Sequence, residues 1–408
     1  MTFEIRPLTP EELPLLDDMV VAVFASDAPP EADRVSGRLQ PEWTLCGFED
    51  GELATSYAAF PFVVRLNGGK APAAGVTVVG THPGYRRRGY LRRIVEADFR
   101  RRYERRMEPL AILLASQAAI YQRYGYAVAS ATLTAVIDPR GIAFAPDAPA
   151  ARGRFRKASK DETPLLDRLY RAFSAPRNGY LHRAPAMWEH RVFGRQPPGA
   201  PHVAVCEEGG EPAGYVVWSL AAQERGNPSL RDDGPPGQRL YVRDYVWLTA
   251  SAYRAMWDFF ASFDLVARVI VELPVDDPAF HLLLEPRRLG LTMRDHLMAR
   301  IIDVERALPL RPYGAEGRVV FRVRDALCPW NEGRWALDAG SERASVVRTD
   351  EEPELDMPIS TLAQLLFGQV APSQTVAWGR AEASPGARLD LWDAMWRTRY
   401  APFCPDTF

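Results

Sequence analysis

The sequence predicts an α+β protein with two mixed α/β domains of similar plan and a smaller third domain. Its 408 residues exceed one ordinary hydrophobic core, which indicates two to four domains. Residues 76–103 combine a β-branched strand, a Pro-Gly break and an amphipathic helix. The order of helix, hairpin, strand, helix and strand in residues 1–138 recurs between residues 162 and 304. We therefore expect domains at 1–145, 146–305 and 306–408.

In the first domain, residues 9–26 have the apolar spacing of a helix. Residues 44–65 read as two strands around Asp50-Gly51, and Asn67-Gly68 leads into the next strand. The helix that follows the Pro-Gly break spaces its apolar residues on one face from Leu91 onward. A final strand is expected over residues 129–137.

The second and third domains follow less distinctive patterns. Strands are expected near residues 203–218, 240–247, 266–274 and 297–304, with helices at 162–173 and 249–263 and a loop at 222–238. The third domain begins with an alternating strand near residue 318 and contains helices at 359–367 and 389–399. These periods support an α+β fold in all three parts.

Composition limits the functional class. With 47% hydrophobic and 25% charged residues the chain is typical of a folded globular protein, and its net charge of −2 argues against a dedicated nucleic-acid binder. The ten arginines between Arg86 and Arg106 could form a nucleic-acid stripe, but their spacing favours an outer helix face paired with Glu96, Asp98 and Glu104.

The cysteine pattern and the apolar runs give further limits. Cys46, Cys206, Cys328 and Cys404 are far apart without a Cys-x-x-Cys pair, so we expect no disulfide and no metal, and a reducing cytoplasm suits the chain. The N-terminus lacks the pattern of a signal peptide, and apolar runs stay well below the ~18 residues that span a bilayer. No membrane association is expected.

The turn into the first amphipathic helix is the strongest chemical signal. A helix N-terminus offers unpaired backbone N–H groups and a positive dipole end, which suit a pyrophosphate. Gly89 leaves room for a phosphate, and Arg86 and Arg87 add charged donors. The Rossmann and Walker patterns are missing. The sequence thus predicts a diphosphate site of another kind.

Two motifs resemble the GNAT family of N-acetyltransferases. Val79 to Gly89 reads Val-x-Thr-x-Pro-x-x-Arg-Arg-x-Gly, which resembles the family's acetyl-CoA pyrophosphate motif. Residues 113–126 end in Ile-Tyr-x-x-x-Gly-Tyr, which is similar to its second signature. The whole chain resembles the enhanced-intracellular-survival (Eis-type) branch, which joins two GNAT folds to a sterol-carrier-like domain. The second domain lacks Arg-x-x-Gly after the strand ending at Trp247, so we expect it not to bind CoA.

The resemblance implies an acetyl-CoA-dependent N-acetyltransferase that works by direct attack of an amine. It makes Tyr121 the acid that protonates the departing thiolate, and a free phenol pKa near ~10 suits this role. The alternative is that Tyr121 only packs under the sheet. The expected acetyl-CoA contacts are Val79, Thr81, Arg86, Arg87, Gly89, Tyr90 and Ser116, where Ser116 could instead be a helix N-cap.

For the base, the resemblance implies the C-terminal carboxylate, here that of Phe408. An α-carboxylate has a pKa near ~3.5, so it would act by holding the amine or a water close to the thioester. The alternatives are a frayed terminus and His82 as the base, although a histidine before proline in a turn is more typical of a structural role.

The acceptor side is expected to combine carboxylates with an aromatic face. Asp27, Trp43 and Asp406 are the candidates, and they suit an aminoglycoside-like amine, a polyamine or a lysine side chain. Thr407 stands where the family has an acidic residue. The resemblance also implies a homo-oligomer, a hexamer. Two other functions remain: a lipid or sterol-like carrier using the third domain, and a DNA-binding regulator.

Overall fold

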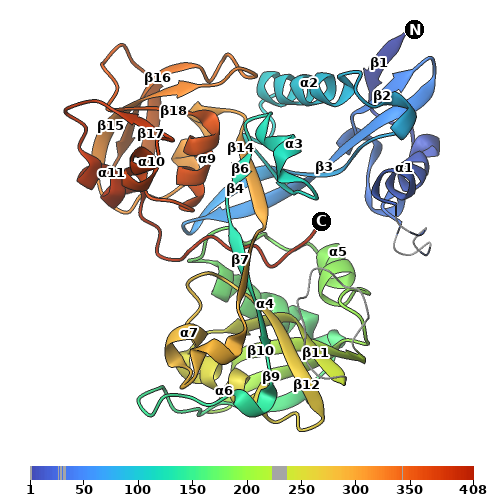
Figure 1. The fold of residues 1–408 in the computed structure, drawn as a ribbon, viewed down its shortest axis with the longest axis vertical. Coiled ribbons are helices and arrows are strands. Elements are labelled where there is room, and N and C mark those ends of the chain that lie inside the picture. The colour runs from blue at the N-terminus through green and yellow to red at the C-terminus, as the bar shows by residue number, and fades with distance from the viewer. Residues whose placement is uncertain (1, 26, 28–29, 31–33, 223–236, 342) are drawn as a thin grey trace. The chain divides into compact units, whose positions relative to one another are not determined.

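The computed structural model describes residues 2–25, 27, 30, 34–222, 237–341 and 343–408. The loop expected at 222–238 lies almost entirely outside these residues. The chain divides into two compact units. Unit 1 comprises Met1–Ser130, His296–Arg399 and Phe408, and unit 2 comprises Ala131–Asp295 and Tyr400–Thr407. Figure 1 follows the chain through both units.

Unit 1 contains a seven-stranded mixed sheet, which includes the blue strands of Figure 1. Within the part of this sheet that the structure describes, only the pair β4–β5 is parallel. In spatial order the strands are β1 (Phe3–Arg6), β2 (Cys46–Glu49), β3 (Glu52–Leu66), β4 (Gly69–Thr81), β5 (Leu110–Leu114), β14 (Leu297–Ile301) and β6 (Ala127–Val128).

Two helices cover opposite faces of this sheet. Side chains alternate along β3, so Ala58 faces α1 (Leu15–Phe24) while Tyr57 faces α2 (Tyr90–Glu104). The apolar face of α2 buries its residues at helical spacing, as the sequence predicts. Buried Asp98 of α2 accepts hydrogen bonds from Tyr57 Oη at 3.0 Å and Arg102 Nε at 2.8 Å. This charged contact fixes α2 on the sheet.

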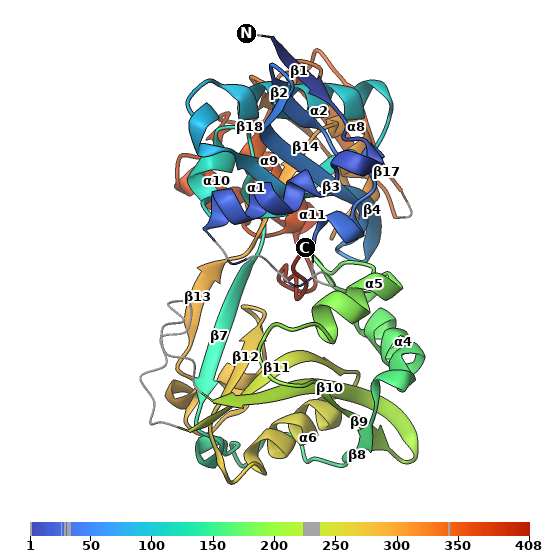
Figure 2. The ribbon, with the colours of Figure 1, turned by 90° about the vertical axis from the view of Figure 1, so that its right-hand side faces the viewer.

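Unit 2 contains a second seven-stranded sheet. α6 (Ala250–Ala261) and α4 (Thr163–Ser174) pack on its opposite faces, because alternate residues of β10 contact each helix. Figure 2 shows α6 along one face. Short helices are α5 (Pro185–Met187) and α7 (Ala279–Leu282). The strand order is β13 (Thr292–Asp295), β7 (Ala131–Ile137), β12 (Val266–Leu273), β11 (Gln238–Trp247), β10 (Glu211–Ala222), β9 (His202–Glu208) and β8 (Arg154–Ala158).

The two sheets exchange strands, which the sequence does not predict. The strand expected to close the first domain is β7, and it pairs with β12 in the second sheet. The strand expected to close the second domain is β14, and it pairs with β5 and β6 in the first. Both runs are short and apolar, so their pattern identifies a strand but not its partner sheet. The domain boundaries at 145 and 305 therefore remain a prediction.

A five-stranded sheet completes unit 1. Its order is β17 (Ala344–Arg348), β16 (Gly333–Ala339), β15 (Gly317–Arg324), β18 (Leu355–Pro358) and β19 (Glu382–Ala383). The nearby helices are α8 (Val304–Ala307), α9 (Ile359–Phe367), α10 (Pro372–Ala377) and α11 (Leu389–Trp396). Among the described residues, no helix combines the length and apolar character needed to cross a membrane.

Candidate active site

The site begins where β4 and β5 separate. Their parallel pairing covers three positions and stops at Gly75 and Ile112, although β4 runs on to Thr81 and β5 to Leu114. Two parallel strands that lose their pairing leave backbone N–H and C=O groups of both strands available to a ligand. The first sheet thus has a natural opening beside its central strand.

A β-bulge lies in β4 at this opening. Ser56 pairs with Gly80 and Ala58 with Thr77, so Val78 and Val79 together oppose one residue of β3. Val78 adopts φ +52°, a value that β-branched residues rarely take. The buried Ser56 Oγ donates to the Val78 carbonyl at 2.7 Å. A strained backbone held by a dedicated hydrogen bond is typical of a functional position.

The mouth of α2 has the properties that the sequence predicts for an anion site. Gly89 is the helix N-cap with φ +76°, and a Cβ added there would meet open space. Arg86 and Arg87 are exposed, and Arg86 Nε donates to the Thr81 carbonyl at 3.2 Å. The positive helix end, two guanidinium groups and an unobstructed glycine fit a pyrophosphate. These residues therefore suit the diphosphate of a CoA thioester.

Tyr90 differs from the expectation for a cofactor contact. Its ring is buried and stacks on Phe3 with ring centroids 3.9 Å apart. Its hydroxyl donates to Glu49, whose other oxygen accepts from Arg88 Nη1 at 2.5 Å. The side chain therefore holds β1, β2 and α2 together, so only the backbone N–H of Tyr90 remains for a ligand.

The second signature forms the end of β5 and α3 (Ala118–Gln122). Ser116 is exposed and precedes the N-cap of α3, which is Gln117. Tyr121 is half-buried and packs edge-on against Tyr126 at 5.9 Å, beside the core cluster that includes Val76 of β4. Burial raises the pKa of Tyr121 to about 12, with a smaller contribution from the nearby Tyr124. The phenol is therefore protonated throughout the physiological range.

Phe408 packs in unit 1 against the strands of the opening. Its ring lies edge-on to Phe62 with centroids 4.9 Å apart. A Cβ added to Gly75 would come within 2.3 Å of the Phe62 ring and 3.3 Å of the Phe408 ring, so this strand position needs glycine. The Phe408 ring thus lies beside the last paired position of β4 and β5.

An aromatic row leads away from Phe408. Phe62 stacks with Phe60 at 5.7 Å, and Trp43 packs edge-on against Phe60 at 5.9 Å. All four rings are partly exposed. Trp43 was expected here, whereas Phe60 and Phe62 were missed. Their i, i+2 spacing in a strand was the available signal, because it places both rings on one face.

Asp406 does not have the open carboxylate expected of a substrate ligand. It is buried in unit 2, where Arg183 Nε donates to it at 2.8 Å and Tyr170 Oη at 3.2 Å. Arg183 also donates to both oxygens of Asp244, at 2.6 and 3.0 Å. Because the buried Asp406 carboxylate is paired with the Arg183 guanidinium, it anchors the tail of residues 400–407. Asp406 therefore has a structural role in place of the expected one.

The same tail lies near the corresponding strand ends of the second sheet. Pairing of β11 with β12 ends at Tyr241 and Ile270, and a small cavity beyond it is lined by both strands and by Phe403 and Pro405 of the tail. The helix that follows, α6, is capped by its own Thr249 Oγ1, which accepts from Ala252 N at 3.0 Å. The second sheet thus has a side-chain cap and a chain segment where the first sheet has an open helix mouth.

The two remaining candidates, His82 and Asp27, are both exposed. His82 is exposed, and its Nδ1 accepts from Gly84 N at 3.3 Å, which caps the turn before α2. Asp27 is exposed, and most of its neighbours between residues 26 and 33 lie outside the described residues. In the described part of the chain, no group of three or more His, Cys, Asp or Glu side chains could hold a metal ion.

Comparison with known proteins identifies the fold. Residues 4–129 and residues 179–301 each match a model described as an acetyltransferase (GNAT) domain, and residues 304–405 match a sterol carrier protein domain. These three matches follow the chain in the order expected from the sequence. A protein with two acetyltransferase (GNAT) folds is an N-acetyltransferase in class.

Full-length relatives define the branch. The chain is 32% identical to an uncharacterized N-acetyltransferase of Streptomyces avermitilis, over 100% of both chains. It is 29% identical to the N-acetyltransferase Eis of Mycobacterium tuberculosis, over 79% of this chain and 77% of that protein. The crystal structure of Eis1 from Mycobacterium abscessus has a TM-score of 0.82 and 28% identity, covering 99% of this chain and 100% of that one. The chain belongs to the Eis-like GNAT N-acetyltransferases.

Proposed function

We propose that this protein acetylates primary amines with acetyl-CoA at the opening between β4 and β5. The observation that carries the proposal is the end of strand pairing at Gly75 and Ile112, next to the β4 bulge and the open mouth of α2. Val79, Thr81, Arg86, Arg87, Gly89, the Tyr90 backbone and Ser116 would hold acetyl-CoA. The CoA thioester supplies the acyl group and the thiol leaving group.

Tyr121 is the proposed general acid. The amine attacks the thioester carbonyl directly, and a backbone N–H of the Val78–Thr81 segment stabilises the developing oxyanion. As the C–S bond breaks, Tyr121 gives its proton to the thiolate. A phenol with a pKa near 12 remains protonated until that step, and the departing thiolate must draw the proton from it. The four cysteines are buried, which argues against a covalent acyl-enzyme.

An α-carboxylate at Phe408 is the proposed base. The ordered packing of its ring on Phe62 supports this role, since an ordered terminus can hold an ammonium group or a water in place. The carboxylate is weakly basic, so its effect comes from its closeness to the amine. It accepts the amine proton as the new C–N bond forms. His82 is the weaker alternative, because its Nδ1 is already engaged by Gly84.

The acceptor is proposed to be a small cationic amine or a lysine side chain. The partly exposed row Trp43, Phe60, Phe62 and Phe408 supports this, since aromatic faces attract ammonium groups. Asp27 is retained as a further contact. On the family resemblance we include aminoglycoside-like amines and polyamines among the acceptors.

A lipid carrier function has less support. In the five-stranded part of unit 1, Phe321, Trp392 and Leu366 are fully buried and fill the space between sheet and helices. A carrier would need that space for a ligand. On the family resemblance we further propose a homohexamer in the cytoplasm, which light scattering on the purified chain and localisation of a tagged protein would test.

The direct test of function is release of CoA thiol from acetyl-CoA in the presence of an amine panel. The panel contains an aminoglycoside, a polyamine and a lysine peptide, with the matching N-acetylated amines as controls. We expect turnover with at least one free amine and none with its acetylated form. Absence of acetyl-CoA binding by calorimetry would contradict the proposal. Binding without turnover on any amine would exclude these acceptor classes.

A further inference from the structure

Unit 2 contains a cavity of about 590 Å³ that the proposed acetyltransferase site does not use. It lies at the β8–β9–β10 edge of the second sheet and extends to α6, whereas the separation of β11 and β12 lies farther along the strand order. Its volume is within the range of small-molecule sites. The lining residues are Phe155, Arg156, Lys157, Ala158, Ser159, Lys160, Phe193, Pro201, His202, Val203, Ala204, Trp218, Phe259 and Phe263.

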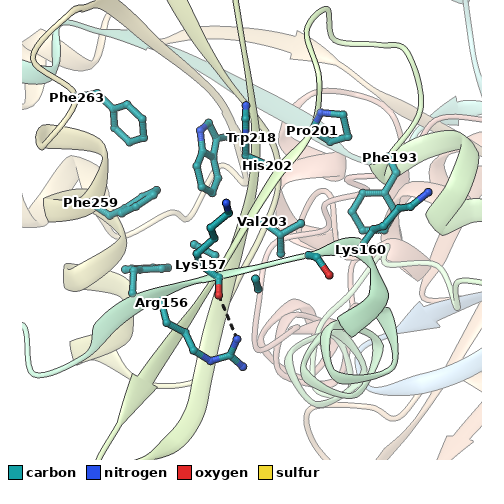
Figure 3. A pocket seen from close by; sticks show the side chains of 14 residues that line it. Arg156, Lys157, Lys160, Phe193, Pro201, His202, Val203, Trp218, Phe259 and Phe263 are labelled. Carbon is teal, nitrogen blue, oxygen red and sulfur yellow. Dashed lines mark hydrogen bonds between the residues drawn. The ribbon is translucent and has the colours of Figure 1, made fainter.

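Aromatic rings form the apolar part of this cavity. Phe155 stacks on Phe259 at 4.7 Å, and Trp218 packs edge-on against both Phe259, at 5.1 Å, and Phe263, at 6.1 Å. Figure 3 shows Trp218, Phe259 and Phe263 grouped on one side of the strands and Phe193 on the other. All of these rings are partly exposed. A concave group of partly exposed rings favours a flat apolar ligand.

The polar part of the cavity is basic. Two of the three lysines in the chain, Lys157 and Lys160, line it, although Lys and Arg together number 50. Both lysines are exposed, and among the described residues neither ammonium group has a carboxylate within ion-pair distance. The neighbouring Arg156 is different, because Glu162 and Glu207 pair with it at 2.8 and 2.6 Å.

Among the residues that the structure describes, the lining contains no aspartate or glutamate, so the lysines give this part of the cavity a net positive charge. His202 adds a further ring, stacked on Trp218 at 5.5 Å. A cationic or neutral ligand would leave the ammonium groups without a counter-charge as it covers them. An anion would satisfy them with charge-assisted hydrogen bonds.

We propose that this cavity binds a small aromatic carboxylate. The rings of Phe155, Trp218 and Phe259 take the planar group, and Lys157, which Figure 3 shows beside Trp218, takes the carboxylate. The site is separate from amine acetylation, since every lining residue belongs to unit 2 and none belongs to the acetyl-CoA set. It gives the second acetyltransferase fold, whose helix mouth is capped by Thr249, a binding role of its own.

The test uses naphthoate as the probe and naphthamide as its neutral match, with calorimetry on the full chain. We expect naphthoate to bind and naphthamide to bind about tenfold more weakly, since only the carboxylate forms charge-assisted hydrogen bonds. Raising the salt concentration should weaken naphthoate binding only. Equal affinity for both probes, or no naphthoate binding at millimolar concentration, would overturn the proposal.

Variants locate the site. Lys157→Gln should weaken naphthoate binding several-fold, while Lys70→Gln, which changes an exposed lysine outside the cavity, should leave it unchanged. Trp218→Leu should reduce the affinity for both probes, whereas Trp378→Leu, at a tryptophan that is 61% exposed, should not. Because the lysines are exposed, their substitution leaves folding intact, which melting curves would verify. Equal effects of the Lys70 and Lys157 changes would contradict the assignment.

Discussion

Tyr121 enters the proposed step as a neutral phenol, and its raised pKa makes it a weaker acid than a free phenol, so its proton moves only as charge develops on the leaving thiolate. Burial is the larger cause of the raised pKa, and Tyr124 adds to it. The sequence motif indicated this tyrosine, but its half-buried position against Tyr126 could not be read from one sequence. A residue's protonation depends on neighbours that only the packing determines.

Replacing Tyr121 with phenylalanine should lower kcat about 100-fold or more, because general acid catalysis of this kind contributes about 10²–10⁴. The dissociation constant of acetyl-CoA should not change. Tyr124→Phe is the matched control, three residues on and also half-buried, and it should retain kcat. Steady-state kinetics with acetyl-CoA calorimetry make the comparison. Equal loss in both variants would remove Tyr121 from the mechanism.

Asp277 in unit 2 makes stability depend on pH. Burial raises its pKa to about 6, while hydrogen bonds from Tyr253 Oη and Ala279 N act in the opposite direction. A folded-state pKa above the unfolded value means that the contribution to stability is present below about pH 4 and is lost as pH rises through 6. The loss by neutral pH is about 3 kcal/mol.

Asp277→Asn should remove this pH dependence, because an amide oxygen accepts the same two hydrogen bonds without a charge. We expect the variant to melt at a higher temperature than the parent near pH 7 and at the same temperature near pH 4. Asp264→Asn, at an exposed aspartate, is the control and should follow the parent. Calorimetric scans of the parent and the variant from pH 4 to pH 7 make the comparison. If the change in melting temperature between these two pH values is the same in both proteins, the assignment to Asp277 is contradicted.

At the scale of elements, the proposed acetyl-CoA site depends on three features, of which the sequence indicated one. The mouth of α2 was predicted from its glycine and arginines, since the chemistry lies in adjacent residues. The bulge at Val78 and the end of β4–β5 pairing were not predicted from the sequence. Each depends on the register between strands that are distant in the sequence. The expected final strand of each domain was placed in the wrong sheet for the same reason.

Gly89→Val tests the helix mouth. A side chain there enters open space but must adopt a left-handed backbone, at a cost of about 1–2 kcal/mol. We expect acetyl-CoA to bind at least about tenfold more weakly. Gly379→Val is the control, with φ +68° and the same open surroundings, and should lose similar stability without changing acetyl-CoA affinity. If both variants bind acetyl-CoA equally well, the mouth of α2 is not the diphosphate site.

Arg183 tests the anchoring of the C-terminal tail. Arg183→Met leaves Asp244 and Asp406 buried without their cation, which should cost about 3–5 kcal/mol. We expect a lower melting temperature and cleavage of residues 400–407 by protease. Arg171→Met breaks an exposed pair with Asp167 and should cost less than about 1 kcal/mol, with the tail still protected. A protected tail in the Arg183 variant would show that other contacts hold it.

At the scale of the whole molecule, the tail connects the two units through the chain. Residues 400–407 pack in unit 2 and Phe408 packs in unit 1, so neighbouring residues are held by different units. The resemblance predicted that the terminus reaches the active site, but not that Asp406 would be an anchor. Residue types near a terminus indicate charge, whereas burial in an ion pair is a property of the folded chain.

The most direct test of the proposed mechanism compares the intact protein with a form that carries a few glycines and serines after Phe408. Both are assayed for acetyl-CoA binding and for CoA release with the amine that gives turnover. Moving the α-carboxylate away should abolish turnover while acetyl-CoA binds as before. Equal turnover in both forms would contradict the role of the terminal carboxylate, and the base would then be another group, with His82 the first to replace.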